Sequence, residues 1–144
     1  MRCQPGDDTD VWAATLAHRP PDVLDTVRDR FVANDVPPDL VRAALDDGGD
    51  ALHAAVTSGA TDWADKFGGP LPAALIAAEV SALAAHLNSR ASAVRSLAVR
   101  ELLDDYSAVT VAAHLAVSRQ KVYEIGRAGT NGTYIDRVPW RGQP

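Results

Sequence analysis

Cysteine is nearly absent from this chain of 144 residues, since Cys3 is the only one. A single thiol excludes a disulfide within the chain and any zinc site built mainly from cysteine. The four histidines are far apart in the sequence and do not have the close spacing of metal ligands. We therefore predict no metal site and no cofactor. The histidines are His18, His53, His86 and His114.

The short motifs of common enzymes are also missing. There is no phosphate-binding loop ending in Gly-Lys-Ser/Thr, no His-Glu-x-x-His motif and no Gly-x-Ser-x-Gly elbow. The two adjacent acidic pairs, at residues 46–47 and 104–105, would diverge around a helix and do not suit paired-carboxylate catalysis. We predict no catalytic residue and no enzymatic activity, which leaves open only a catalytic group assembled from distant positions.

Alternating patterns typical of strands are absent before residue 125, and no secretory signal is visible at the start of the chain. The longest apolar-rich run, residues 71–87, contains Glu79, Ser81 and His86 and makes a poor membrane span. An apolar content of 47% excludes general disorder. These features predict a mainly all-α, cytoplasmic protein without a membrane partner.

Prolines and glycines divide residues 1–69 into short helical pieces, which we expect to form an acidic helical region, either a bundle or a partner-binding surface. The expected helices span 10–18, 21–34, 38–47 and 51–57, and a further one contains Trp63 and Phe67. Asp50 and Thr61 are the expected N-caps of the last two.

Residues 70–89 are predicted to form a linking helix. Its apolar residues continue toward the C-terminus as an approximate seven-residue repeat, interrupted where Arg90 replaces an apolar residue. This pattern fits either a helix packed on its own N-terminal bundle or a dimer seam. Asn88 and Ser89 are the expected break before a helix over 90–105, whose inward side chains would be Val94, Leu97, Ala98, Leu102 and Leu103.

Residues 108–127 have the spacing of a DNA-binding helix-turn-helix. Ser107 and Ser118 stand where N-cap hydroxyls are needed, and the second helix is expected from about Arg119 to about Gly126. A small residue would allow the two helices to cross closely, and apolar residues would point inward beneath them. These are Ala112 at the crossing, Val117 beneath the turn, and Val111, Leu115, Val122 and Ile125 in the core.

The segment resembles bacterial helix-turn-helix regulators, whose turns commonly have Leu-Gly-Val-Ser followed by Arg and a polar residue. Residues 115–120 here are Leu-Ala-Val-Ser-Arg-Gln. Ala116 thus replaces a glycine that often has positive φ, at a cost on the order of 1 kcal/mol. The resemblance covers about 20 residues and implies a DNA-binding transcriptional regulator, with a repressor as the expected kind.

Residues 90–144 would form the DNA-binding domain, ending in either a small β-hairpin wing or an ordered tail. Asn131 and Gly132 are a pair favoured in tight hairpin turns, and Tyr134, Ile135 and Val138 would supply the returning strand of a wing. In the tail alternative, Trp140 packs on the core.

Charge is distributed unevenly along the chain. Residues 1–89 contain six basic and fourteen acidic side chains, whereas residues 90–144 contain eight basic and five acidic ones. Local positive charge suits phosphate contacts. We therefore expect a homodimer that binds palindromic double-stranded DNA with its recognition helix in the major groove. The expected DNA-binding residues are Ser118, Arg119, Gln120, Lys121, Tyr123, Arg127, Arg137 and Arg141.

Two other functions stay open. In the first, the acidic N-terminal half binds a partner protein, so that the chain is a protein-interaction module or an antitoxin-like protein. In the second, the N-terminal helices enclose a small ligand in a pocket lined by Trp12, Phe31, Trp63 and Phe67.

Overall fold

The computed structural model describes residues 5–130, and within them every regular element is helical. The mainly all-α fold predicted from the sequence is therefore confirmed. The wing or tail, with Arg137 and Arg141, lies outside the described residues. The elements are α1 (Pro5–Thr15), α2 (Pro21–Ala33), α3 (Pro38–Asp46), α4 (Asp50–Thr57), the 3-10 helix η1 (Asp65–Phe67), α5 (Pro70–Asp105), α6 (Ala108–Leu115) and α7 (Arg119–Ala128).

The described residues separate into two units at Ala84. The first contains α1 to α4, η1 and the beginning of α5, and the second contains the remainder of α5 with α6 and α7. α5 is common to both units.

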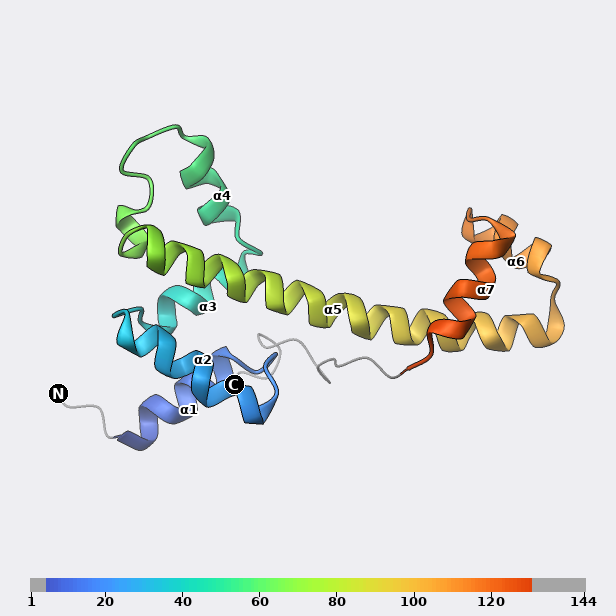
Figure 1. The fold of residues 1–144 in the computed structure, drawn as a ribbon, viewed down its shortest axis with the longest axis horizontal. Coiled ribbons are helices and arrows are strands. Elements are labelled where there is room, and N and C mark those ends of the chain that lie inside the picture. Colours follow the sequence, from blue (N-terminus) through green and yellow to red (C-terminus); the bar gives the residue numbers. More distant parts are fainter. Residues whose placement is uncertain (1–4, 131–144) are drawn as a thin grey trace. The chain divides into compact units, whose positions relative to one another are not determined.

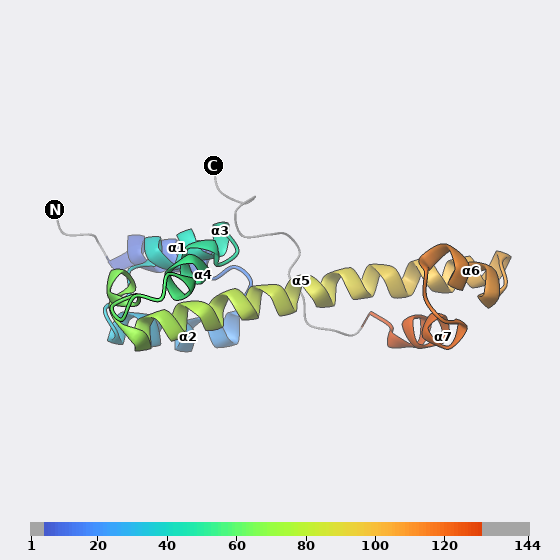
Figure 2. The ribbon, with the colours of Figure 1, turned by 90° about the horizontal axis from the view of Figure 1, so that it is seen from above.

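In the first unit, α1 to α4 gather around the beginning of α5, with α2 and α4 on different sides of it (Figures 1 and 2). α3 lies against both α1 and α4. The core receives large apolar side chains from each of these elements, and their burial is the main favourable contribution to its folding. The buried Trp12 and Phe31 stack within it, with ring centroids 5.6 Å apart. Other buried side chains include Leu16, Val41, Leu45, Phe67, Ile76 and Leu83.

The caps of the short helices differ from the prediction at two places. Asp47, not Asp50, satisfies the start of α4, because its carboxylate accepts hydrogen bonds from the backbone N–H groups of Gly49, Asp50 and Ala51. The expected helix after Thr61 is only the three-residue η1, and no side chain caps it. The Asp47 carboxylate, three residues before Asp50, thus accepts the hydrogen bonds at the start of α4 that were expected of the Asp50 side chain.

α5 runs without interruption through Asn88 and Ser89, so the predicted break there is wrong. Asn and Ser each cost only about 0.5 kcal/mol relative to alanine in a helix interior. The stretch after Pro72 contains neither proline nor glycine up to Gly126. Its many alanines and leucines therefore outweigh these two weak residues.

Among the described residues, α5 is also the one helix whose length and composition would allow it to cross a membrane. One such helix is weak support for a span, because the core helix of a soluble protein passes the same test. In this helix Ile76, Leu83 and Glu79 are buried, and Glu79 is bonded to His18 and Arg19 of the first unit. The absence of a membrane partner stays a prediction.

The core of the second unit lies between α5, α6 and α7 (Figure 1). Its α5 side is formed by Ser96 and Val99, with Leu103 partly buried beside them. The predicted inward set is therefore mostly wrong. Of its five members only Leu103 faces this core, whereas Val94, Leu97, Ala98 and Leu102 are exposed.

Candidate nucleic-acid interface

Two short helices joined by a three-residue turn form the candidate interface. α6 begins at Ser107, whose hydroxyl accepts a hydrogen bond from the backbone N–H of Thr110. It ends at Ala116, which adopts the left-handed conformation with φ 56° and ψ 43°. This is the backbone conformation expected for the glycine that Ala116 replaces, so the turn keeps its geometry at some conformational cost.

The start of α7 is capped as the sequence predicted. The Ser118 hydroxyl accepts a hydrogen bond from the backbone N–H of Lys121 at 3.0 Å. Val122 and Ile125 then point into the core of the second unit, where they meet Val111 and Ala112 of α6. Local capping and two buried side chains together fix which side of α7 faces water.

Leu115 and the end of α7 differ from the prediction. Leu115 was expected in the core but is 39% exposed, because α6 ends there and only Val117 closes the core beneath the turn. α7 continues two residues past Gly126 and ends before Gly129, which has φ 74° and ψ −165°. Such a backbone is open to glycine alone, so Gly129, rather than Gly126, ends the helix.

Ser96 connects the end of α7 to α5. Its buried hydroxyl donates to the carbonyl oxygen of Gly126 at 3.2 Å and accepts from the backbone N–H of Gly129 at 2.9 Å. It therefore satisfies one carbonyl and one N–H where the helix ends. Sequence reasoning missed this residue, because a serine in an apolar-rich helix gives no sign that its partners lie 30 residues away.

Six predicted DNA-binding residues lie on the exposed surface of α7 or at its start. Arg119, Tyr123 and Arg127 follow one another at four-residue spacing and share one face, with Gln120 beside them. This face lies away from Val122 and Ile125. All six residues are exposed, namely Ser118, Arg119, Gln120, Lys121, Tyr123 and Arg127.

Lys121 is the member of the set that lies apart from the others. Its ammonium group is 3.8 Å from a carboxylate oxygen of Glu124, one turn later on α7. Exposed pairs of this kind contribute little to stability and are easily exchanged for another anion. The Arg119 face therefore presents two arginines, a phenol and an amide. It is bordered by the Lys121–Glu124 pair, because Glu124 lies one turn from both Gln120 and Arg127.

Arg100 of α5 is a further cation beside α7 and was not among the residues predicted to bind DNA. Its Cγ would lie 3.6 Å from a Cβ placed on Gly126, so its aliphatic chain runs beside the end of α7. Residues 85–130 contain six basic and four acidic side chains, and the acids other than Glu124 are at the end of α5. The charge on α7 is therefore mainly positive.

The first unit contains a buried charged residue, Glu79 of α5. Glu79, 2% exposed, lies 2.7 Å from His18 Nε2 and receives two hydrogen bonds from the guanidinium of Arg19, at 2.6 and 3.1 Å. Burial raises the pKa of Glu79, but the hydrogen bonds from His18 and Arg19 outweigh burial and hold that pKa below its ordinary value. The same contact to Glu79 raises the pKa of Arg19. The cluster ties α5 to the segment after α1.

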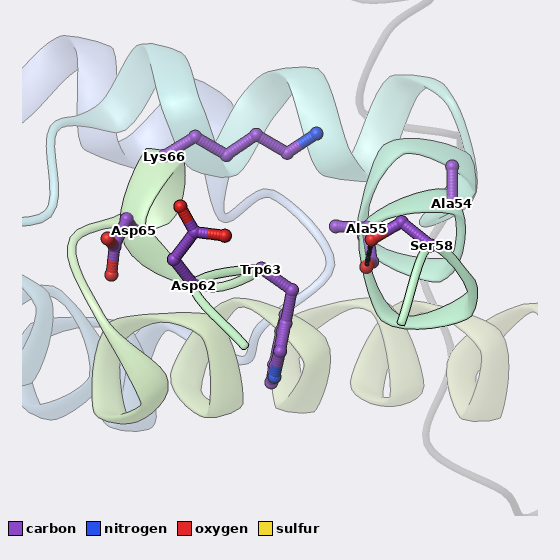
Figure 3. A pocket seen from close by; sticks show the side chains of 7 residues that line it. All are labelled: Ala54, Ala55, Ser58, Asp62, Trp63, Asp65 and Lys66. Atoms are coloured by element: carbon purple, nitrogen blue, oxygen red, sulfur yellow. Dashed lines mark hydrogen bonds between the residues drawn. The ribbon is translucent and has the colours of Figure 1, made fainter. Parts of the chain in front are cut away.

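The four aromatic residues of the small-ligand alternative do not line one pocket. Trp12, Phe31 and Phe67 are core residues. Trp63 lines two cavities, one of about 500 Å³ between α4 and the beginning of α5 and one of about 380 Å³, whereas Phe31 borders a separate cavity of only about 30 Å³. In Figure 3 the Trp63 indole extends toward α5 beside the smaller cavity, which is bordered by Ala55, Ser58 and the charged side chains near η1.

Residues 5–130 contain no group of three or more His, Cys, Asp or Glu side chains placed to hold a metal ion. Comparison with models of known protein families, with curated proteins and with solved structures finds no match to this chain. The functional proposal therefore depends on the geometry and charge of the second unit.

Proposed function

We propose that this protein is a sequence-specific DNA-binding transcriptional regulator, a repressor that acts as a homodimer on palindromic sites. The observation that carries the proposal is α7 itself, a helix capped at both ends whose exposed face holds Arg119, Gln120, Tyr123 and Arg127. A helix of this composition, presented after a tight turn, suits entry into the major groove.

Each exposed side chain of α7 has a contact that its chemistry favours. Gln120 can bind adenine through two hydrogen bonds, and Arg119 can bind guanine in the same way or a phosphate oxygen. The Ser118 hydroxyl and the Tyr123 phenol can also bond to bases or phosphates near the start of the helix. Lys121 and Arg127 would hold phosphates on either side.

The test selects genomic fragments with the purified full-length protein and measures the affinity of the recovered site. Arg119→Ala should weaken binding by about 1–3 kcal/mol, roughly 5-fold to 150-fold. The matched control is Arg30→Ala, an exposed arginine on α2 in the first unit. Arg30→Ala should leave the affinity unchanged.

The pattern of loss assigns the role of Arg119. A loss limited to sites with one particular base pair indicates base contact, whereas an equal loss on all sequences indicates a phosphate contact. Equal affinities of the Arg119→Ala variant, the Arg30→Ala variant and the wild type would contradict the proposal.

A second candidate function is binding of a basic partner protein by the first unit. Among residues 10–84, exposed aspartates far outnumber the exposed cations, which are Arg30 and Lys66. Asp22, Asp25 and Asp29 lie at three- and four-residue spacing along one side of α2. Changing these three to Asn should abolish a salt-sensitive protein complex while leaving DNA affinity intact. A DNA affinity that falls with the same change would argue against two separate surfaces.

A further inference from the structure

The second unit carries an exposed apolar stripe on α5, away from α6 and α7 in the part of the chain that the structure describes. Val94 is 67% exposed and Leu97 is 50% exposed. The side of α5 that packs against α6 and α7 holds Ser96, Val99 and Leu103. At 3.6 residues per turn, the Val94 and Leu97 side is about 150° away from that packed side. Neither α6 nor α7 can therefore cover it.

Charged residues continue the stripe in both directions. Arg90 lies one turn before Val94, and Glu101 lies one turn after Leu97. Positions 90, 94, 97 and 101 are separated by four, three and four residues, which is the spacing of a heptad seam. The half-buried Leu87, three residues before Arg90, begins this seam. Neither Arg90 nor Glu101 has an ion pair within the described residues. Along the helix the order is therefore basic, apolar, apolar, acidic.

We propose that two copies of this chain pair antiparallel through residues 87–104 of α5. In this register Val94 of one copy packs against Leu97 of the other, and Arg90 lies opposite Glu101. A two-fold axis between residues 95 and 96 repeats both contacts. The exposed Ala91 and Ala98 border the seam and allow the two helices to approach closely.

Charge favours this direction over the parallel one. A parallel seam would place Arg90 against Arg90 and Glu101 against Glu101, whereas the antiparallel seam pairs opposite charges twice. The paired face is opposite to the one that holds α7, so both copies keep their Arg119 face free. The pairing supplies the homodimer on which the proposed function rests, although its test needs no DNA.

Charge reversal tests the register in the full-length protein. Sedimentation equilibrium should show a dimer for the wild type, and Arg90→Glu or Glu101→Arg should each raise the dissociation constant about tenfold, because each converts two attractive pairs into repulsive ones. The double variant carrying both changes restores opposite charges and should return to the wild-type constant. Single changes without effect, or a double variant that is not restored, would overturn the antiparallel register.

A second pair of variants tests the apolar contact. Val94→Asp should abolish the dimer, whereas Val109→Asp, at a valine on α6 that is 62% exposed, should not. Circular dichroism establishes that both variants keep the helical content of the wild type. A wild type that is monomeric at several hundred micromolar, or a dimer lost with Val109→Asp and kept with Val94→Asp, would overturn the proposal.

Cross-linking separates the two directions independently, with Cys3→Ser as background. Residues 87 and 104 face each other in the antiparallel register, while two copies of residue 87 are about 25 Å apart at 1.5 Å per residue. Mixing Leu87→Cys with Asp104→Cys protein should therefore give a disulfide-linked dimer, and Leu87→Cys alone should not. Efficient self-linking by Leu87→Cys would indicate a parallel pair and contradict the inference.

The outcomes for pairing and for DNA binding are distinguishable. A dimer with these variant effects that fails to bind DNA refutes the proposed function and leaves the pairing standing. A protein that binds DNA through α7 but stays monomeric refutes the pairing alone.

Discussion

At the scale of single residues, Glu79 is the clearest case in which sequence position gave little indication of role. Its carboxylate is buried in the apolar core and is held by His18 and Arg19, more than 50 residues earlier in the chain. A buried carboxylate with two cationic or donor partners stabilises the fold only while both partners remain. Removing its charge should therefore affect the first unit directly.

Glu79→Gln should lower the free energy of unfolding by about 1–3 kcal/mol at neutral pH. Because the pKa of Glu79 in the folded protein lies below its ordinary value of 4.5, its contribution is present above that pH and is lost as the pH falls through the lower folded value. Urea unfolding of both proteins from pH 6 downward measures the difference. The gap between them should narrow below about pH 4.5, and a gap that widens there would contradict the assignment.

Ala116 shows what a local pattern can establish. The resemblance of residues 115–120 placed a glycine-like backbone at this position, and the structure has φ 56° there in spite of the methyl group. Ser107 and Ser118 were likewise predicted as caps and act as caps. Each of these features depends on partners within three residues, which is why the sequence alone was sufficient.

At the scale of helices, the inward face of α5 shows where sequence reasoning fails. Val94 and Leu97 are apolar and were predicted to be buried, whereas the polar Ser96 is the fully buried residue. Apolar periodicity identifies a stripe but does not identify what covers it. The partners of Ser96 lie on α7, so its role depended on the fold of the whole unit.

Ser96→Ala tests how far α5 controls the end of α7. The change removes one hydrogen bond to Gly126 and one from Gly129, so the free energy of unfolding should fall by about 1–3 kcal/mol. Ser81→Ala, at an exposed serine of the same helix, should change it by less than about 0.5 kcal/mol. Chemical denaturation followed by circular dichroism compares the two. Similar values for both variants would show that Ser96 does not hold α7.

At the scale of the whole chain, the two units differ in charge as well as in structure. Residues 1–89 are acidic, whereas α7 carries three cations and one acid on its surface. Sequence reasoning detected this asymmetry, because it follows directly from the numbers of acidic and basic residues in each part of the chain. It did not place the boundary at Ala84 within a continuous helix, since nothing local marks the change of packing partner.

Net charge and local charge lead to opposite expectations for DNA. The chain as a whole has a formal charge of −5, which would repel a polyanion. Phosphates close to α7 would nevertheless meet mainly Arg119, Lys121 and Arg127. If these side chains bind DNA, counterions are released from the phosphates and the affinity must fall steeply with salt.

The most direct test of the proposed function is therefore the affinity of the full-length protein for duplex DNA across a salt series. With three phosphate contacts per copy, log K should fall with log salt at a slope of about −2.7 for one copy and twice that for a dimer. The Arg127→Ala variant should reduce the slope by about one per copy. Absence of any binding to random or genomic DNA at low salt would contradict the proposal that this protein is a DNA-binding regulator.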